Sequence, residues 1–192
     1  MLYNTRRAYG LVTILFHWSI AALFIGQIAL GLTMLRLDDQ RRVFELIQLH
    51  KSIGFLILAL VILRILWRLA VLSPDLPSGM SKIERGAANL SHAALYGLML
   101  GLPLTGWVLV SVSTLGIVTL VFGKLLIPNL PLPPSDAAEL LWSWVHAVLA
   151  FGAAVLIVLH MGAALWHQFV RRDGLLVRML VPGREERTDG HR

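Results

Sequence analysis

Hydrophobic residues gather in four long runs, separated by shorter polar segments. These runs predict helices over about residues 11–35, 46–69, 88–112 and 138–170, each long enough to cross the ~30 Å apolar core of a bilayer. The first run is too long for a signal peptide and lacks a small-residue cleavage site, so we expect a retained membrane helix. The pattern therefore predicts an all-α membrane protein, a four-transmembrane-helix bundle of up-down-up-down order.

The segments between the runs predict how the helices connect. Residues 36–45 read as a short polar connection, and residues 73–85 as a linker containing proline and glycine. Residues 113–136 are apolar but rich in proline, which predicts an interfacial loop or a short surface helix. Pro103 and Gly106 lie inside the third helix, where a kink is expected. We expect one transmembrane domain over residues 1–181 and a basic cytoplasmic tail over residues 182–192.

Composition narrows the class of protein and its chemistry. The chain is 57% hydrophobic and 15% charged, with a mean hydropathy of +0.73, which indicates an integral membrane protein. Its net charge is +6, but the arginines flank hydrophobic runs, which favours contact with the lipid bilayer over nucleic acid. Cysteine is absent from the sequence, which excludes disulfides, iron–sulfur clusters, thiolate-bound haem and covalent c-type haem.

Lysine and arginine are distributed unequally between the two sides of the predicted helices. Twelve lie in the terminal segments or near the connection between the second and third helices, and five lie on the other side. The positive-inside rule therefore predicts that both termini are cytoplasmic.

The last helix carries His146, His160 and His167 at spacings of 14 and 7 residues, which places them on nearly one helix face. At ~1.5 Å per residue, His146 and His160 are expected about 21 Å apart along that helix. The topology puts His50 at the outer level with His146, and His17 at the inner level with His160. Two imidazoles on different helices at one depth are what a bis-histidine haem requires. The sequence thus predicts two haem b groups, an outer one on His50 and His146 and an inner one on His17 and His160.

The other histidines are assigned less directly. His92 and His167 are expected at the cytoplasmic edge, as a proton relay near a quinone or as interfacial hydrogen-bonding groups. His167 shares the stripe of His160 and is therefore the alternative inner ligand. His191 lies in the tail and is expected to be uninvolved.

Cations beside the predicted ligands are candidates for binding haem propionates. Lys51 follows His50 directly and is a candidate partner of an outer propionate. Arg64 and Arg68 either extend to the inner interface or pair with propionates.

Four sequence elements carry a resemblance to a known family. FHW in the first helix, HKSIG in the second, LPLTGW in the third and the H-x13-H-x6-H spacing in the fourth resemble bacterial cytochrome b561 proteins. The resemblance extends to about Val181 and implies haem ligands at His17, His50, His146 and His160. It also implies an inner-membrane electron-transport protein that exchanges electrons with ubiquinone, and one branch of the family acts as a superoxide oxidase.

Three functions remain open at this point. The first is an oxidoreductase that conducts electrons from a periplasmic donor such as superoxide to quinone. Cations available to attract such an anion are Arg36, Arg41, Arg42, Lys51 and Lys124. The second is a membrane-anchor cytochrome subunit for a hydrogenase or another periplasmic oxidoreductase, with residues 36–45 and 113–136 as docking surfaces. The third is a haem-free metal transporter with a path of histidines.

Overall fold

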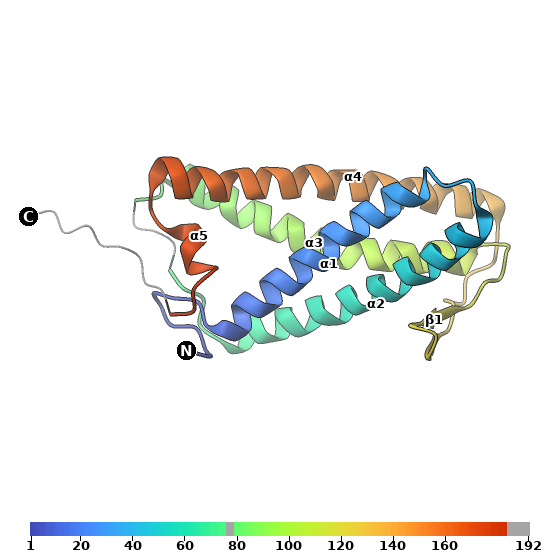
Figure 1. Cartoon of the computed structure of the whole chain (residues 1–192), viewed down its shortest axis with the longest axis horizontal. Helices are drawn as coiled ribbons and strands as arrows, with labels where there is room; N and C mark the ends of the chain where they lie inside the picture. The colour runs from blue at the N-terminus through green and yellow to red at the C-terminus, as the bar shows by residue number, and fades with distance from the viewer. Residues whose placement is uncertain (76–78, 184–192) are drawn as a thin grey trace, which may run out of the picture. The chain divides into compact units, whose positions relative to one another are not determined.

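The computed structural model describes residues 1–75 and 79–183, and the tail from residue 184 lies outside the described part. Its four long helices are α1 (Leu11–Met34), α2 (Gln40–Ala70), α3 (Lys82–Val112) and α4 (Asp136–Trp166) (Figure 1). A π-helical turn, η1 (His167–Arg171), continues α4, and a short helix, α5 (Leu175–Arg178), follows. All four long helices are long and apolar enough to cross a membrane. The prediction of four membrane helices is confirmed.

The chain divides into two compact units, and every long helix contributes a segment to each. Unit 1 comprises Met1–Ser19, Ile62–Ala94 and the chain from Val155 onward, and unit 2 comprises Ile20–Val61 and Leu95–Ala154. This division also separates the histidines. His50 and His146 belong to unit 2, whereas His17, His92, His160 and His167 belong to unit 1.

Polar caps extend two helices beyond their predicted starts. At α2, Asp39 Oδ1 accepts hydrogen bonds from the backbone N–H groups of Arg41 and Arg42 at 3.0 and 3.3 Å. At α3, Ser81 Oγ accepts from Glu84 N, and Glu84 Oε2 accepts from Ser81 N, which is a capping box. The predicted starts at residues 46 and 88 were therefore wrong. The first turns of these helices are polar, and hydrophobicity alone does not detect them.

The segment between α3 and α4 contains a β-hairpin. Strand β1 (Thr119–Val121) pairs antiparallel with β2 (Leu125–Ile127), with Thr119 opposite Ile127. Phe122 and Gly123 have φ values of 49° and 68°, and two positive φ angles are what a type I′ hairpin turn requires. The surface helix expected as one of two forms is wrong, and the hairpin was not predicted; the interfacial position of this segment stays a prediction.

Apolar side chains occupy both the core and the outer faces of the helices. In unit 2, Ile20, Ile57, Val61 and Ala153 are at most 1% exposed. On α4, Val158 is 69% exposed and Leu159 is 63% exposed. Large apolar groups in contact with the surroundings agree with a helix that faces lipid.

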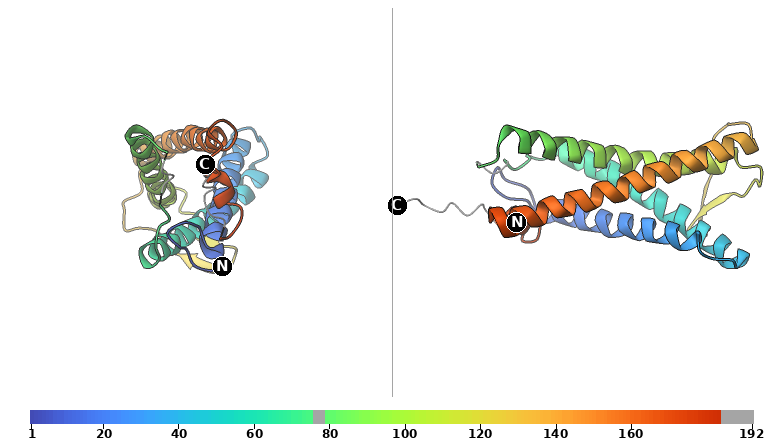
Figure 2. Two further views of the ribbon diagram at one scale, coloured as in Figure 1. Left: turned by 90° about the vertical axis from the view of Figure 1, so that its left-hand side faces the viewer. Right: turned by 90° about the horizontal axis from the view of Figure 1, so that it is seen from above.

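A buried arginine joins three segments of unit 1. Arg178 is 2% exposed, and both of its terminal nitrogens donate to the Asp75 carbonyl oxygen at 3.1 Å. Its guanidinium also lies 5.7 Å from the centre of the Tyr9 ring. The N-terminal segment, the α2–α3 connection and α5 therefore meet at this residue. Figure 2 shows the ribbon of α5 near the N-terminal segment.

Gly10 packs too tightly against the N-terminal segment to accept a side chain. An added Cβ would lie 2.3 Å from Leu2 O and 2.5 Å from Tyr3 C, and both are backbone atoms. We expect Gly10→Ala to lower the free energy of unfolding by about 1–3 kcal/mol, measured by thermal denaturation in detergent. Gly86→Ala is the control, because a Cβ there meets no described atom within 4 Å. Equal midpoints for the two variants would contradict this account.

Candidate functional site

In unit 2, His50 on α2 and His146 on α4 bring their rings together. The ring centres are 6.1 Å apart and the ring planes are inclined by 74°. A metal about 2 Å from one nitrogen of each ring, with each ring centre about 1 Å behind its nitrogen, requires a separation of about 6 Å. The observed distance therefore fits one iron held between these two imidazoles.

In unit 1, His17 on α1 and His160 on α4 form a second pair of similar dimensions. Their ring centres are 6.3 Å apart and their planes are inclined by 54°. This separation again fits one iron between two imidazoles. The structure thus brings together both histidine pairs that the sequence predicted.

His92 lies beside the pair in unit 1. Its ring centre is 5.5 Å from that of His160. Because α3 begins at Lys82, His92 lies ten residues into the helix. Its place at the cytoplasmic edge of the membrane stays a prediction. Three imidazole rings are therefore neighbours in unit 1, because the ring of His160 lies next to those of both His17 and His92.

His167 has a different kind of partner. Its Nδ1 is 2.5 Å from Asp173 Oδ2, and both side chains are largely buried. His167 begins the π-helical turn η1. The hydrogen-bonding role considered for His167 is the one this contact supports.

The predicted propionate partners have other contacts in this structure. Arg64 Nη2 lies 3.4 Å from His17 Nδ1. Lys51 Nζ donates to the Val118 carbonyl oxygen at 3.3 Å, which uses one of its three protons. Among the other predicted anion-attracting cations, Arg41 pairs with Glu45 and Arg42 with Asp39, all on exposed side chains.

Two residues of the LPLTGW element contact His146, although α3 supplies no predicted ligand. Thr105 Oγ1 is 3.0 Å from His146 Nδ1. A Cβ added to Gly106 would lie 3.3 Å from His146 Cε1. From the sequence, this element indicated only a family resemblance. The spacing of its residues does not show which neighbouring helix they face.

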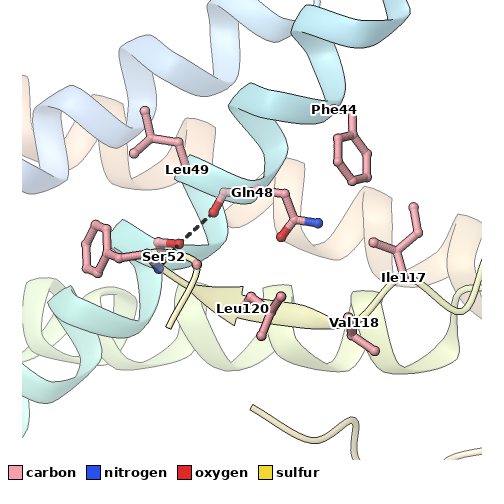
Figure 3. A pocket seen from close by; sticks show the side chains of 9 residues that line it. Phe44, Gln48, Leu49, Ser52, Ile117, Val118 and Leu120 are labelled. Atoms are coloured by element: carbon pink, nitrogen blue, oxygen red, sulfur yellow. Dashed lines mark hydrogen bonds between the residues drawn. The ribbon is translucent and has the colours of Figure 1, made fainter. Parts of the chain in front are cut away.

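An apolar pocket of about 370 Å³ lies between α2 and the hairpin segment in unit 2 (Figure 3). On α2 it is lined by Phe44, Gln48, Leu49 and Ser52. Residues 48 and 50 point about 200° apart around a helix, so the pocket is on a different face of α2 from His50. Ser52 Oγ joins the two sides, because it donates to Gln48 O and accepts from Phe122 N.

Comparison with known proteins identifies the family. The family model for prokaryotic cytochrome b561 matches residues 8–182. The chain belongs to the prokaryotic cytochrome b561 family. Members of this family bind b-type haem and transfer electrons in membranes, and their four-helix bundle agrees with the four membrane-length helices seen here.

Three relatives illustrate the range of similarity within the cytochrome b561 family. Cytochrome b561 homolog 2 of Escherichia coli (strain K12) is 35% identical over 181 residues, which are 92% of this chain and 93% of that protein. Probable superoxide oxidase CybB of Yersinia pestis is 33% identical over 132 residues, or 69% and 73% of the two chains. Cytochrome b561 homolog 1 of Escherichia coli (strain K12) is 28% identical over 131 residues, or 68% and 72%. This chain is therefore a bacterial-type membrane cytochrome.

The close approach of Gly106 to His146 gives a test of the site in unit 2. Gly106→Ala would place a methyl group 3.3 Å from His146 Cε1, which displaces the ring. If His146 is a haem ligand, we expect the variant to hold that haem about tenfold more weakly, measured as a lower haem content after purification by pyridine haemochrome titration. Gly101→Ala on the same helix is the control, since its Cβ meets no described atom within 4 Å. Full haem content in Gly106→Ala would contradict the expected displacement.

Proposed function

We propose that this cytochrome holds two b-type haems, one on His50 and His146 and one on His17 and His160. The observation that carries the proposal is the paired imidazoles, with ring centres 6.1 Å apart in unit 2 and 6.3 Å apart in unit 1. His50 adds support, because its Nδ1 is buried without a described hydrogen-bond partner. A buried polar atom without a partner is costly, and ligation would give this ring one.

When bound, haem would supply a one-electron redox centre, and ligation by two imidazoles would favour electron transfer over oxygen chemistry. The protein holds each imidazole on a separate helix, which fixes its direction. Arg64 donates toward His17 Nδ1 here, whereas a His17 that binds through Nε2 carries its proton on Nδ1. The guanidinium of Arg64 is then a candidate donor to a propionate carboxylate, because its planar set of N–H groups suits a carboxylate. Lys51 has two further protons to donate and is the candidate partner of a propionate of the outer haem.

The proposed activity is that of an oxidoreductase that relays electrons from a periplasmic donor to ubiquinone in the bacterial inner membrane, with both termini cytoplasmic. Superoxide is the proposed donor. The similarity to the probable superoxide oxidase of Yersinia pestis supports this, as does the position of Lys51 directly after the ligand His50. The alternative is a membrane-anchor cytochrome subunit that receives electrons from a periplasmic redox protein.

Haem quantitation on histidine variants tests the ligand assignment. We expect two haems per chain in the wild type and one haem in each of His17→Ala, His50→Ala, His146→Ala and His160→Ala. His92→Ala and His167→Ala are the matched controls and should keep both. The measurements are pyridine haemochrome titration and reduced-minus-oxidised spectra. If His92→Ala lost a haem and His17→Ala kept two, His92 would be the partner of His160.

Superoxide-driven quinone reduction tests the proposed donor. The purified protein should reduce a soluble ubiquinone analogue when superoxide is generated enzymatically, and the rate should fall as ionic strength rises. We expect Lys51→Gln to lower the rate by a factor of about two to five, because one attractive charge is removed near the electron entry point. Lys82→Gln, on the side proposed to be cytoplasmic, is the control. A haem-loaded protein that is inactive with superoxide but co-purifies with a large redox partner would support the anchor alternative.

A further inference from the structure

The hydroxyl of Thr105 makes two contacts that together fix the position of a proton on His146. Thr105 Oγ1 is 2.9 Å from the Leu102 carbonyl oxygen and 3.0 Å from His146 Nδ1. A carbonyl has no proton, so the hydrogen bond to Leu102 uses the single proton of the hydroxyl. The oxygen then accepts from His146, with the hydrogen on Nδ1. The Leu102 carbonyl favours the same arrangement, because it also accepts a hydrogen bond from this ring.

A neutral imidazole that is protonated on Nδ1 presents its lone pair on Nε2. We propose that Thr105 is a positioning residue that holds His146 in this tautomer and orientation, so that Nε2 is the atom offered to the outer haem iron. This inference rests on the proposed ligation by His146. It assigns a function to α3, the one long helix that provides no ligand in that proposal.

Two contacts of His146 restrict the position and orientation of its imidazole ring. Thr105 accepts from one edge, and the absence of a side chain at Gly106 lets Cε1 approach, since an added Cβ would be 3.3 Å away. Both residues belong to the LPLTGW element, and they are adjacent in the sequence. One turn of α3 therefore provides the hydrogen-bond acceptor and the space that the ring needs.

Two of the other proposed ligands lack an equivalent acceptor among the described residues. No described residue accepts a hydrogen bond from the ring of His50, and His17 Nδ1 faces a donor, Arg64. A hydrogen bond accepted from the distal nitrogen makes a histidine ligand more basic. The outer iron would thus have unequal ligands, and the more basic His146 would favour its oxidised state.

Thr105→Val tests the proposal because valine keeps the shape of threonine but has no acceptor. We expect the outer haem to be held about tenfold more weakly. Its midpoint potential should rise by about 59 mV, the equivalent of a tenfold change for one electron. The inner haem should be unchanged. Potentials are measured by spectroelectrochemistry, and the low-spin ferric signals by electron paramagnetic resonance, which reports imidazole orientation.

Two further variants separate the hydrogen bond from packing. Thr105→Ser retains the hydroxyl and should restore the wild-type potential and signal. Thr33→Val is the matched control, because Thr33 Oγ1 also donates to a backbone carbonyl of its own helix, Ala29 O at 2.8 Å, and is exposed. It should change neither haem.

Several outcomes would overturn the inference. These are a Thr105→Val protein identical to the wild type, or serine and valine variants that shift equally. If Thr105→Val binds no outer haem at all, retention of both haems by Thr105→Ser supports the proposal, and loss in both variants refutes it. The His146→Ala variant distinguishes failure of the ligand assignment from failure of the role given to Thr105. Retention of both haems in that variant would refute the ligand assignment itself, whereas loss of one haem with an unaffected Thr105→Val would refute only the role of Thr105.

Discussion

Imidazoles inside apolar helices are the constraint on which the rest of this structure depends. A polar ring far from water is costly unless another group satisfies its nitrogens, and membrane helices offer few such groups. Here the rings lie next to one another instead of being distributed separately over the helices. His50 is beside His146, and His160 is beside both His17 and His92. Such an arrangement agrees with the haem sites proposed for this member of a family that binds b-type haem.

The two units satisfy this constraint in different ways. In unit 2 the described contacts of His146 are neutral, the Thr105 hydroxyl and the backbone at Gly106, and Lys51 follows His50 in the sequence. In unit 1 the neighbours include a third imidazole and the guanidinium of Arg64. Positive charge beside a redox centre favours its reduced form, because reduction adds an electron. Two centres with the same ligand type would therefore differ in potential through their surroundings, which is how a relay acquires a direction.

The sequence predicted the parts of the molecule that hydrophobicity and spacing control. Four long apolar runs are sufficient to locate four helices, and a 14-residue spacing is sufficient to assign His146 and His160 to different levels of α4. Hydrophobicity could not locate the polar first turns of α2 and α3, although the Ser81–Glu84 capping box is visible in the sequence. That omission had a further effect, since the late start assigned to α3 put His92 near the beginning of the helix, whereas it lies ten residues after Lys82. The contact between Thr105 and His146 depends on the rotation of α3 about its own axis, which the sequence of one helix does not determine.

The attachment of the hairpin segment to α2 affects how this protein can change over evolution. Two consecutive residues after His50 bind the segment, Lys51 through the Val118 carbonyl and Ser52 through the Phe122 amide. Both contacts use backbone atoms of the loop, and these atoms are present whatever the loop side chains are. The exposed side chains of Val118 and Leu120 can therefore be replaced without loss of the attachment beside His50. Such a surface could acquire a new electron donor while the haem site proposed on His50 and His146 stays unaltered.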